Sequence, residues 1–435
     1  MGQCSRRFAD VLRGKAVTYI VKKILLSLLL LHTVTAFAQP TVSPEVASDP
    51  IPGRASVSSF AIPALAMARD RKGLVVAWTA QGPDGRDQIA VVRLDGSAHF
   101  AGPVRMIPAA SLVPVNGADP SIAAAPGGDG FVLVWIERPS NGSVVAYCRL
   151  DADLNPSAPV IVPSRNGFSI GSPPIVRSGK TTWLTADTWV WQIRADGSLS
   201  GPFDGGILVS DMAVTTDFPQ LVSGITKTSD TFTCKSEPGC TVGGGPFRGY
   251  CYENCRINGY SYGLSFTALY TVSAATRFAL NTDTKPAIRS DGHDALMAWF
   301  LGTESNGGLL VSARLNPASF TQFSQAANDH RVLATLGPDA GASRPDIASD
   351  DDRYVVVWRT TSPTHDHDIA GASVDRSGNI IAFPIATSSD DERDPSVIAI
   401  GSGTFLVAYE KFNSAGERRI AGRLVTFASR SHAVR

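Results

Sequence analysis

The sequence predicts an all-β fold, a single β-propeller of seven four-stranded blades, on the strength of three observations. A motif that opens at a proline recurs across the chain about every 55 residues. Each copy holds several short apolar runs separated by Gly and Asp turns. Helical periodicity is almost absent beyond the N-terminal leader. A β-sandwich does not account for this self-similarity, whereas propeller blades do.

The repeat is clearest in three copies, in which a proline segment leads through a polar turn to an apolar run. Residues 119–123 lead to 131–135, residues 285–288 to 295–299, and residues 344–348 to 354–358. Two more copies are clear and two are weaker. The prolines that open the units are Pro63, Pro120, Pro173, Pro219, Pro286, Pro345 and Pro395.

The elements within a unit follow a fixed order. The first strand is rich in Ala and Ser beside one larger aliphatic residue, which suits the crowded position near a propeller axis. The second strand is an apolar run because a blade buries both of its faces. In five units this strand ends in a large aromatic residue that we expect to fill the core between blades: Trp78, Trp135, Trp299, Trp358 and Tyr409. A third strand follows, as in residues 368–375, and then a fourth short apolar piece, as in residues 380–385.

The last unit has no fourth strand of its own. Residues 54–60 have the character of a strand but no blade, so they are predicted to complete the last blade and remove its open edge. We therefore expect a propeller domain over residues 55–428, with a cysteine-rich insertion at 234–259. Residues 39–54 are expected to be a flexible lead-in and 429–435 a tail.

These repeats resemble those of secreted bacterial propellers and are similar to TolB-type repeats, which also start at a proline and place Asp-Ile before the third strand. Residues 368–371 carry the Asp-Ile-x-Gly pattern, and residues 375–378 carry Asp-x-x-Gly. The chain departs from the TolB pattern because Ser-Pro-Asp-Gly is absent and the second strand ends in Trp. The resemblance covers about residues 55–428 and implies the fold alone.

The N-terminus has the features of a secretory signal peptide. Lys22 and Lys23 precede an apolar run, and residues 36–38 form a small-x-small cleavage site, so cleavage after Ala38 is predicted. An uncleaved anchor is the alternative. Cleavage leaves 33 basic and 38 acidic residues, a net charge of −5. A mildly acidic, exported chain is expected to bind neither nucleic acid nor an anionic membrane. We expect a bacterial, secreted or periplasmic monomer.

Five cysteines remain after cleavage. Cys234, Cys240, Cys251 and Cys255 lie close together, and such a cluster in an exported protein indicates two disulfides of unassigned pairing. Zinc is the alternative, although the spacings fit poorly with zinc ribbons. Cys148 lies in an apolar run and is predicted to be a buried free thiol.

Candidate site residues come from two places. Residues just before the repeat prolines are predicted to surround the mouth of the central channel: Asp119, Lys285, Arg344 and Asp394. Their mixed charges suit either a polar ligand or a solvated rim. His365 and His367 stand beside two carboxylates and suggest either a binding site or a polar loop between strands; we predict no bound metal and no cofactor.

The sequence is compatible with three classes of function. The chain is expected to be a binding or interaction module for a polar ligand, a glycan or a protein, rather than an enzyme. The alternative is a carbohydrate-active enzyme, a glycoside hydrolase or lyase, that uses carboxylates on the loop-rich face. The third is a structural domain of a cell-surface assembly. No motif of nucleophilic or metal-dependent hydrolysis is present.

Overall fold

A computed structural model describes residues 39–48 and 65–428 of the chain, apart from internal gaps. These gaps fall at residues 71, 83, 111–115, 126–128, 140–141, 164–173, 179–180, 205–208, 210, 215–218, 224–231, 237–251, 258–262, 269–275, 280–285, 304–306, 316–329, 339–343, 351, 363–366 and 402. The described regular structure is entirely β-strand. Within these ranges, no helix has the length and apolar character that crossing a membrane requires.

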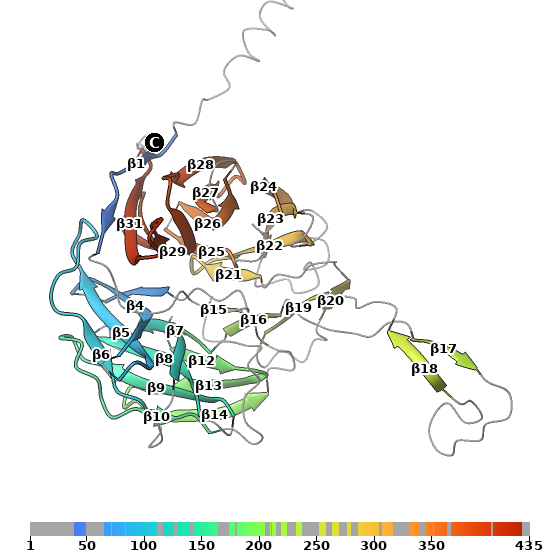
Figure 1. The fold of residues 1–435 in the computed structure, drawn as a ribbon, viewed down its shortest axis with the longest axis horizontal. Coiled ribbons are helices and arrows are strands. Elements are labelled where there is room, and N and C mark those ends of the chain that lie inside the picture. Colours follow the sequence, from blue (N-terminus) through green and yellow to red (C-terminus); the bar gives the residue numbers. More distant parts are fainter. Residues whose placement is uncertain are drawn as a thin grey trace, which may run out of the picture. The chain divides into compact units, whose positions relative to one another are not determined.

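The described strands form antiparallel sheets, most of them with four strands (Figure 1). The first sheet contains β3 (Leu65–Arg69), β4 (Leu74–Gln81), β5 (Asp87–Leu94) and β6 (Arg105–Ile107). The second contains β7 (Asn116–Ala124), β8 (Phe131–Arg138), β9 (Val144–Leu150) and β10 (Val160–Ile161). The third contains β11 (Ile175–Ser178), β12 (Thr182–Ala186), β13 (Trp189–Ile193) and β14 (Leu199–Asp204).

The fourth sheet contains β15 (Asp211–Val214), β16 (Pro219–Ser223), β19 (Gly263–Ala268) and β20 (Thr276–Ala279). A two-stranded sheet of β17 (Phe232–Ser236) and β18 (Tyr252–Ile257) lies between β16 and β19 along the chain. The fifth contains β21 (Ala287–Ser290), β22 (Ala295–Thr303), β23 (Gly307–Leu315) and β24 (Arg331–Leu336). The sixth contains β25 (Asp346–Ser349), β26 (Arg353–Thr361), β27 (His367–Asp375) and β28 (Ile380–Ala386).

The last sheet has five strands because two short segments from the N-terminal side join it. Its main strands are β29 (Asp391–Gly401), β30 (Thr404–Phe412) and β31 (Arg418–Thr426). β1 (Thr41–Val42) and β2 (Val46–Ala47) both pair with β31. Strands from opposite ends of the sequence therefore share one sheet.

The four-stranded sheets and the last sheet have a propeller-like arrangement, in which their first strands contact one another. β3 contacts β7, β7 contacts β11, and the same relation continues through β15, β21, β25 and β29. β29 in turn contacts β3. The first strands of the four-stranded sheets and of the last sheet are therefore neighbours in chain order; Figure 1 labels β7, β15, β21, β25 and β29 among them.

A recurring hydrogen bond joins neighbouring first strands. The Ser121 hydroxyl of β7 accepts the amide N–H of Val176 in β11 at 3.1 Å. The Asp211 carboxylate of β15 accepts the Ile288 N–H of β21 at 2.9 Å, and Asp346 of β25 accepts the Val397 N–H of β29 at 3.0 Å. Each acceptor is buried. Because a buried amide without a partner is costly, these side chains fix how adjacent sheets meet.

The aromatic residues that end the second strands are core residues, as predicted. Trp78, Trp135, Trp299, Trp358 and Tyr409 are each at most 3% exposed. They lie in clusters that combine residues of neighbouring sheets; Trp78, for example, shares a cluster with Leu406 and Ile420 of the last sheet. The sequence repeat thus reflects packing between sheets.

Two sequence predictions need correction at the boundaries. The fourth unit does not begin at Pro219, which instead opens the second strand, β16; the first strand, β15, begins at Asp211. Asp211 serves as the acceptor toward the next sheet, so this unit keeps the inter-sheet bond without the opening proline. Residues 41–47, predicted as part of a flexible lead-in, form β1 and β2. Residues 54–60, predicted to complete the last sheet, lie outside the described residues.

Candidate functional site

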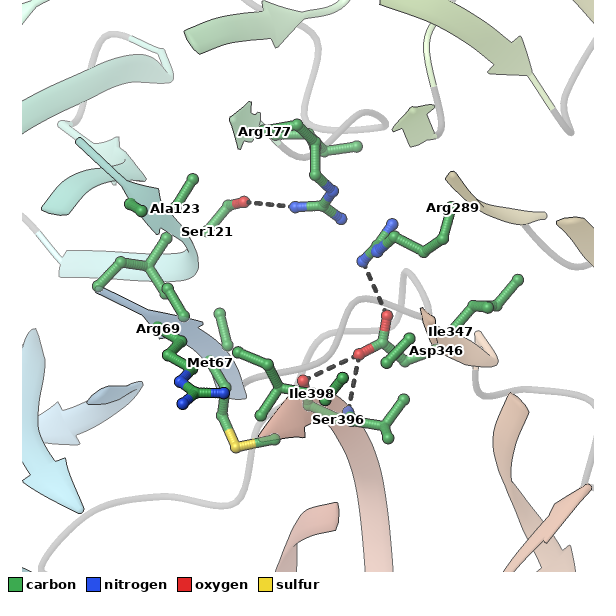
Figure 2. A pocket seen from close by; sticks show the side chains of 18 of the residues that line it. Met67, Arg69, Ser121, Ala123, Arg177, Arg289, Asp346, Ile347, Ser396 and Ile398 are labelled. Carbon is green, nitrogen blue, oxygen red and sulfur yellow. Dashed lines mark hydrogen bonds and ion pairs between the residues drawn. The ribbon is translucent and has the colours of Figure 1, made fainter. Parts of the chain in front are cut away.

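A cavity of about 360 Å³ lies among the first strands. Its described walls come from β3, β7, β11, β21, β25 and β29 and from residues just before them. Alanine and serine are frequent on these walls, and this is why space remains at the centre. Arginine side chains from several strands lie around it (Figure 2).

The charged layer of the cavity is built on Asp211, whose side chain is fully buried. Arg177 Nη2 of β11 lies 3.1 Å from Asp211 Oδ1, and Arg289 Nη1 of β21 lies 2.8 Å from Asp211 Oδ2. Arg344, just before β25, also forms an ion pair with Asp211 Oδ2. Three guanidinium groups from separate parts of the chain therefore converge on one carboxylate.

A second carboxylate extends this network. Arg289 Nη2 donates to Asp346 Oδ1 at 2.9 Å, and Ser396 Oγ donates to Asp346 Oδ2 at 2.9 Å. On the other side, Arg177 Nη1 lies 3.4 Å from Ser121 Oγ. Figure 2 shows Ser121, Arg177, Arg289, Asp346 and Ser396 following one another around the cavity wall.

The electrostatics of this layer follow from burial and close charges. Burial raises the pKa of Asp211, but the attraction of Arg289, Arg344 and Arg177 outweighs it and holds that pKa far below its usual range. Burial together with the nearby Arg289 charge lowers the pKa of Arg177 to about 9, so this guanidinium stays protonated at neutral pH. Burial lowers the pKa of Arg289, but Asp211 and Asp346 outweigh it, and the pKa is raised.

Unsatisfied donors remain in this layer. Within the described part of the chain, Arg177 Nε and Arg344 Nε are buried without a hydrogen-bond partner. Arg344 is 5% exposed and lines the cavity. Buried donors usually find partners, so an acceptor that entered the cavity would meet a site with spare donor capacity.

The predicted mouth residues fall into different environments. Arg344 belongs to the cavity. Asp119 is buried and pairs with Arg138 at the end of β8, with 2.9 Å between Nη2 and Oδ2. Asp119 and Asp394 both have left-handed backbone conformations, with φ of 57° and 47°, at irregularities just before a repeat proline. Lys285 lies outside the described residues.

A second group of polar side chains gathers where β29 begins. His367 Nδ1 lies 2.8 Å from Asp391 Oδ1, and Arg393 also pairs with Asp391. Burial raises the pKa of Asp391, but the His367 and Arg393 hydrogen bonds outweigh it and the pKa is lowered. His365 lies outside the described residues. Among the residues that are described, no group of three or more potential metal-ligating side chains occurs.

Asp394 and Glu410 form the acidic part of this group. Burial and the Glu410 charge raise the pKa of Asp394 to about 7. Glu410 forms a buried ion pair with Arg418, and Arg418 Nη1 donates to the Thr79 carbonyl of the first sheet at 2.7 Å. A carboxylic acid that keeps its proton near neutral pH is able to act as a general acid.

Comparisons with known proteins give weak likenesses. No family model matches the chain, and no curated protein matches it. A Dyadobacter fermentans protein of unknown function is 11% identical, with a TM-score of 0.46 over 89% of this chain and 99% of that one. The α-L-arabinofuranosidase PaAbf62A from Podospora anserina, solved with cellotriose, is 10% identical, with a TM-score of 0.35 over 90% and 98%. The GH43_1 enzyme from Xanthomonas citri is 13% identical, with a TM-score of 0.35 over 89% and 92%.

Most of the charged layer lies outside the residues that the repeat pattern predicts as a site. Arg177 and Arg289 each stand three residues after a proline, Pro174 or Pro286, where three other copies have alanine. The local sequence does contain one indication of a polar site: an arginine stands inside a strand that otherwise consists of small and aliphatic residues. The convergence on Asp211 was hidden because its unit lacks the opening proline.

The cysteine-rich insertion is described only in part. Cys234 lies on β17 and Cys255 on β18, while Cys240 and Cys251 lie outside the described residues. The register pairs Thr233 with Arg256 and Lys235 with Glu253, so Cys234 stands opposite residues 254 and 255 at an irregularity. Cys148 is a buried free thiol, as predicted, and burial raises its pKa to about 12.

Proposed function

We propose that the chain is an exported, seven-bladed β-propeller that acts as a binding module, and that its central cavity binds a small anionic ligand. The observation that carries the proposal is the charged layer at the cavity: Arg177, Arg289, Arg344 and Asp346 line it, and the buried Asp211 pairs with all three arginines. Arginine is suited to anions because its planar fork donates two parallel hydrogen bonds to an oxyanion.

Support for seven blades comes from the sheet order, in which β29 contacts β3 and the N-terminal strands fill the edge of the last sheet. Support for export comes from the leader that precedes Gln39. Binding in the central cavity does not require catalysis. The proposed role of the module is therefore to recognise or capture a ligand outside the cytoplasm.

The test is thermal unfolding of the mature chain, residues 39–435, in sodium acetate against sodium chloride at equal ionic strength. Acetate is expected to raise the melting temperature because it binds only the folded state. Arg177→Gln is expected to abolish the increase. Arg86→Gln, which removes an arginine of a surface ion pair, is the matched control and should behave as wild type. Equal responses from both variants, or no response in wild type, would overturn the proposal.

The second candidate function is a carbohydrate-active enzyme that uses the carboxylates near the start of β29. The raised pKa of Asp394 beside Glu410 favours it, because glycoside cleavage needs one carboxyl group that is still protonated. A screen with chromogenic glycosides tests it. Activity should be lost in Asp394→Asn, which tolerates the left-handed backbone, and kept in the surface variant Asp84→Asn. An inactive wild type across the screen contradicts this candidate.

A further inference from the structure

We infer that the ligand of the central cavity is an amphipathic monocarboxylate: a single carboxylate on an apolar body. The inference rests on the proposed function and specifies its ligand class. Three features of the cavity carry it: the net charge of the buried layer, the placement of its donors, and the apolar character of the remaining wall.

The net charge selects a monovalent anion. Arg177, Arg289 and Arg344 stand against Asp211 and Asp346, so the described charged layer has one positive charge in excess. One carboxylate neutralises this excess. A dianionic phosphate ester would leave a buried negative charge, which is strongly unfavourable at low dielectric constant. Arg69 also lines the cavity, but its side chain is exposed and donates to the Ile400 carbonyl.

The donors suit a carboxylate held at one side. The Arg177 and Arg289 side chains both pair with Asp211 and line the cavity, and each keeps 20% of its surface exposed. The Ser121 hydroxyl lies beside Arg177, and Arg344 Nε is a buried donor without a partner. Figure 2 shows that Arg177 and Arg289 lie together at one side of the cavity.

Most of the remaining wall is apolar, and its polar members are Arg69, Ser349 and Ser396. Met67, Ala123, Ile347 and Ile398 line it, and Figure 2 shows Met67 and Ile398 away from Arg177 and Arg289. The described lining contains no aromatic ring and no Asn or Gln side chain. A sugar, which needs stacking surfaces and several hydrogen-bonding partners, is therefore matched poorly, whereas an aliphatic chain is matched well.

Isothermal titration calorimetry of the mature chain tests the inference with sodium hexanoate, sodium acetate, sodium phosphate and neutral hexanamide. Hexanoate is expected to bind at least about tenfold more tightly than acetate, since each buried methylene contributes about 0.8 kcal/mol. At about pH 8, where inorganic phosphate is mostly a dianion, phosphate should bind at least about tenfold more weakly than hexanoate, because its second charge is left without a partner. Hexanamide should not bind, because it carries no charge.

Two variants test the apolar wall and the arginines separately. Ile398→Ser should weaken hexanoate but leave acetate unchanged, and this preserved acetate binding also shows that the variant is folded. Arg177→Gln should weaken both acids. Equal affinity for acetate and hexanoate, or tighter phosphate, would overturn the inference and leave anion binding standing. Binding of hexanamide as strong as hexanoate, or no binding of any anion, would overturn the proposed function as well.

Discussion

The Asp211 carboxylate is fully buried and forms ion pairs with guanidinium groups from three other parts of the chain. Its Oδ2 atom also accepts the Ile288 N–H of the next sheet. The same side chain therefore neutralises buried positive charge and joins neighbouring sheets. Its removal should affect the charge balance of the cavity and the contact between the sheets.

We predict that Asp211→Asn lowers the free energy of unfolding by about 3–5 kcal/mol, the usual effect of leaving buried charges without their partner. Urea denaturation followed by tryptophan fluorescence measures it. The surface variant Asp84→Asn, which removes only an exposed pair with Arg86, should change the midpoint little. A similar small effect for Asp211→Asn would show that the arginines rearrange without it.

The pH dependence of this effect has a defined sign. The folded pKa of Asp211 is held below its unfolded value of about 3.9, so its contribution to stability is present above that pH. As the pH falls below about 4 toward the folded pKa, the contribution is lost. The difference in unfolding free energy between wild type and Asp211→Asn should therefore shrink in acid, and a difference that grows instead would contradict the assignment.

At the scale of single residues, the sequence predicted packing better than chemistry. Trp135 and Tyr409 were recognised as core residues because an aromatic after an apolar run signals burial directly. The network around Asp211 joins residues far apart in sequence, and nothing in the local pattern around Arg177 or Arg289 indicates which carboxylate each will meet. Only Arg344 was selected in advance, through its place before a repeat proline.

At the scale of elements, the N-terminal strands β1 and β2 are held to the last sheet by more than backbone pairing. Glu45, between them, accepts Tyr409 Oη and Lys411 Nζ, each at 2.7 Å. Ser43 Oγ also accepts the Leu424 N–H at 2.9 Å. Short strands of two residues pair weakly, so these side-chain contacts account for much of their attachment.

Glu45→Ala is predicted to lower the free energy of unfolding by about 1–3 kcal/mol, because it leaves partly buried donors without an acceptor. Burial raises the pKa of Glu45, but the Lys411 and Tyr409 hydrogen bonds outweigh it, so the folded pKa is lowered and the stabilisation fades as the pH falls through about 4. Thermal unfolding at pH 7 and pH 3 measures both. The exposed Glu417→Ala is the control; equal effects of the two substitutions would contradict the role of Glu45.

The cysteine-rich insertion is predicted to carry two disulfides among Cys234, Cys240, Cys251 and Cys255. Alkylation and mass spectrometry test it on the mature protein. The native protein should label at no thiol, since burial protects Cys148 and raises its pKa. After denaturation without reduction one thiol should label, and after reduction five. Four additional thiols before reduction, or one bound zinc per chain, would contradict the disulfides.

At the scale of the whole molecule, the recurring prolines predicted an all-β fold of repeated antiparallel sheets, but they did not predict where each sheet begins. The fourth unit began at Asp211 because an acidic acceptor, rather than a proline, marks its first strand. The strands that pair with β31 lie within residues 41–47. This segment is rich in Pro and Ser and lacks an apolar run, so its sequence does not indicate a strand. The repeated pattern predicts the strand order within each sheet. The positions that depart from it, Arg177, Arg289 and Asp211, form the charged layer of the cavity.

A chain that begins at residue 49 should lack β1 and β2 and expose the edge of β31. We expect a lower melting temperature and concentration-dependent association, because an open strand edge pairs with other molecules. Size-exclusion chromatography at increasing concentration, beside the chain that begins at Gln39, measures the association. A monomeric truncated chain with an unchanged melting temperature would show that these strands are not required.

The pairing of β1 and β2 with β31 joins residues that are far apart in the sequence: the Ser48 side chain, next to β2, accepts the N–H of Ile420, 372 positions later. During synthesis, every other sheet has all its strands available before this one does. The entropy of closing this long loop is lost late in folding, because the N-terminal segment stays unpaired until β31 has been synthesised. Folding should therefore show a late, slow phase that belongs to the last sheet alone and is missing from a chain without residues 39–48.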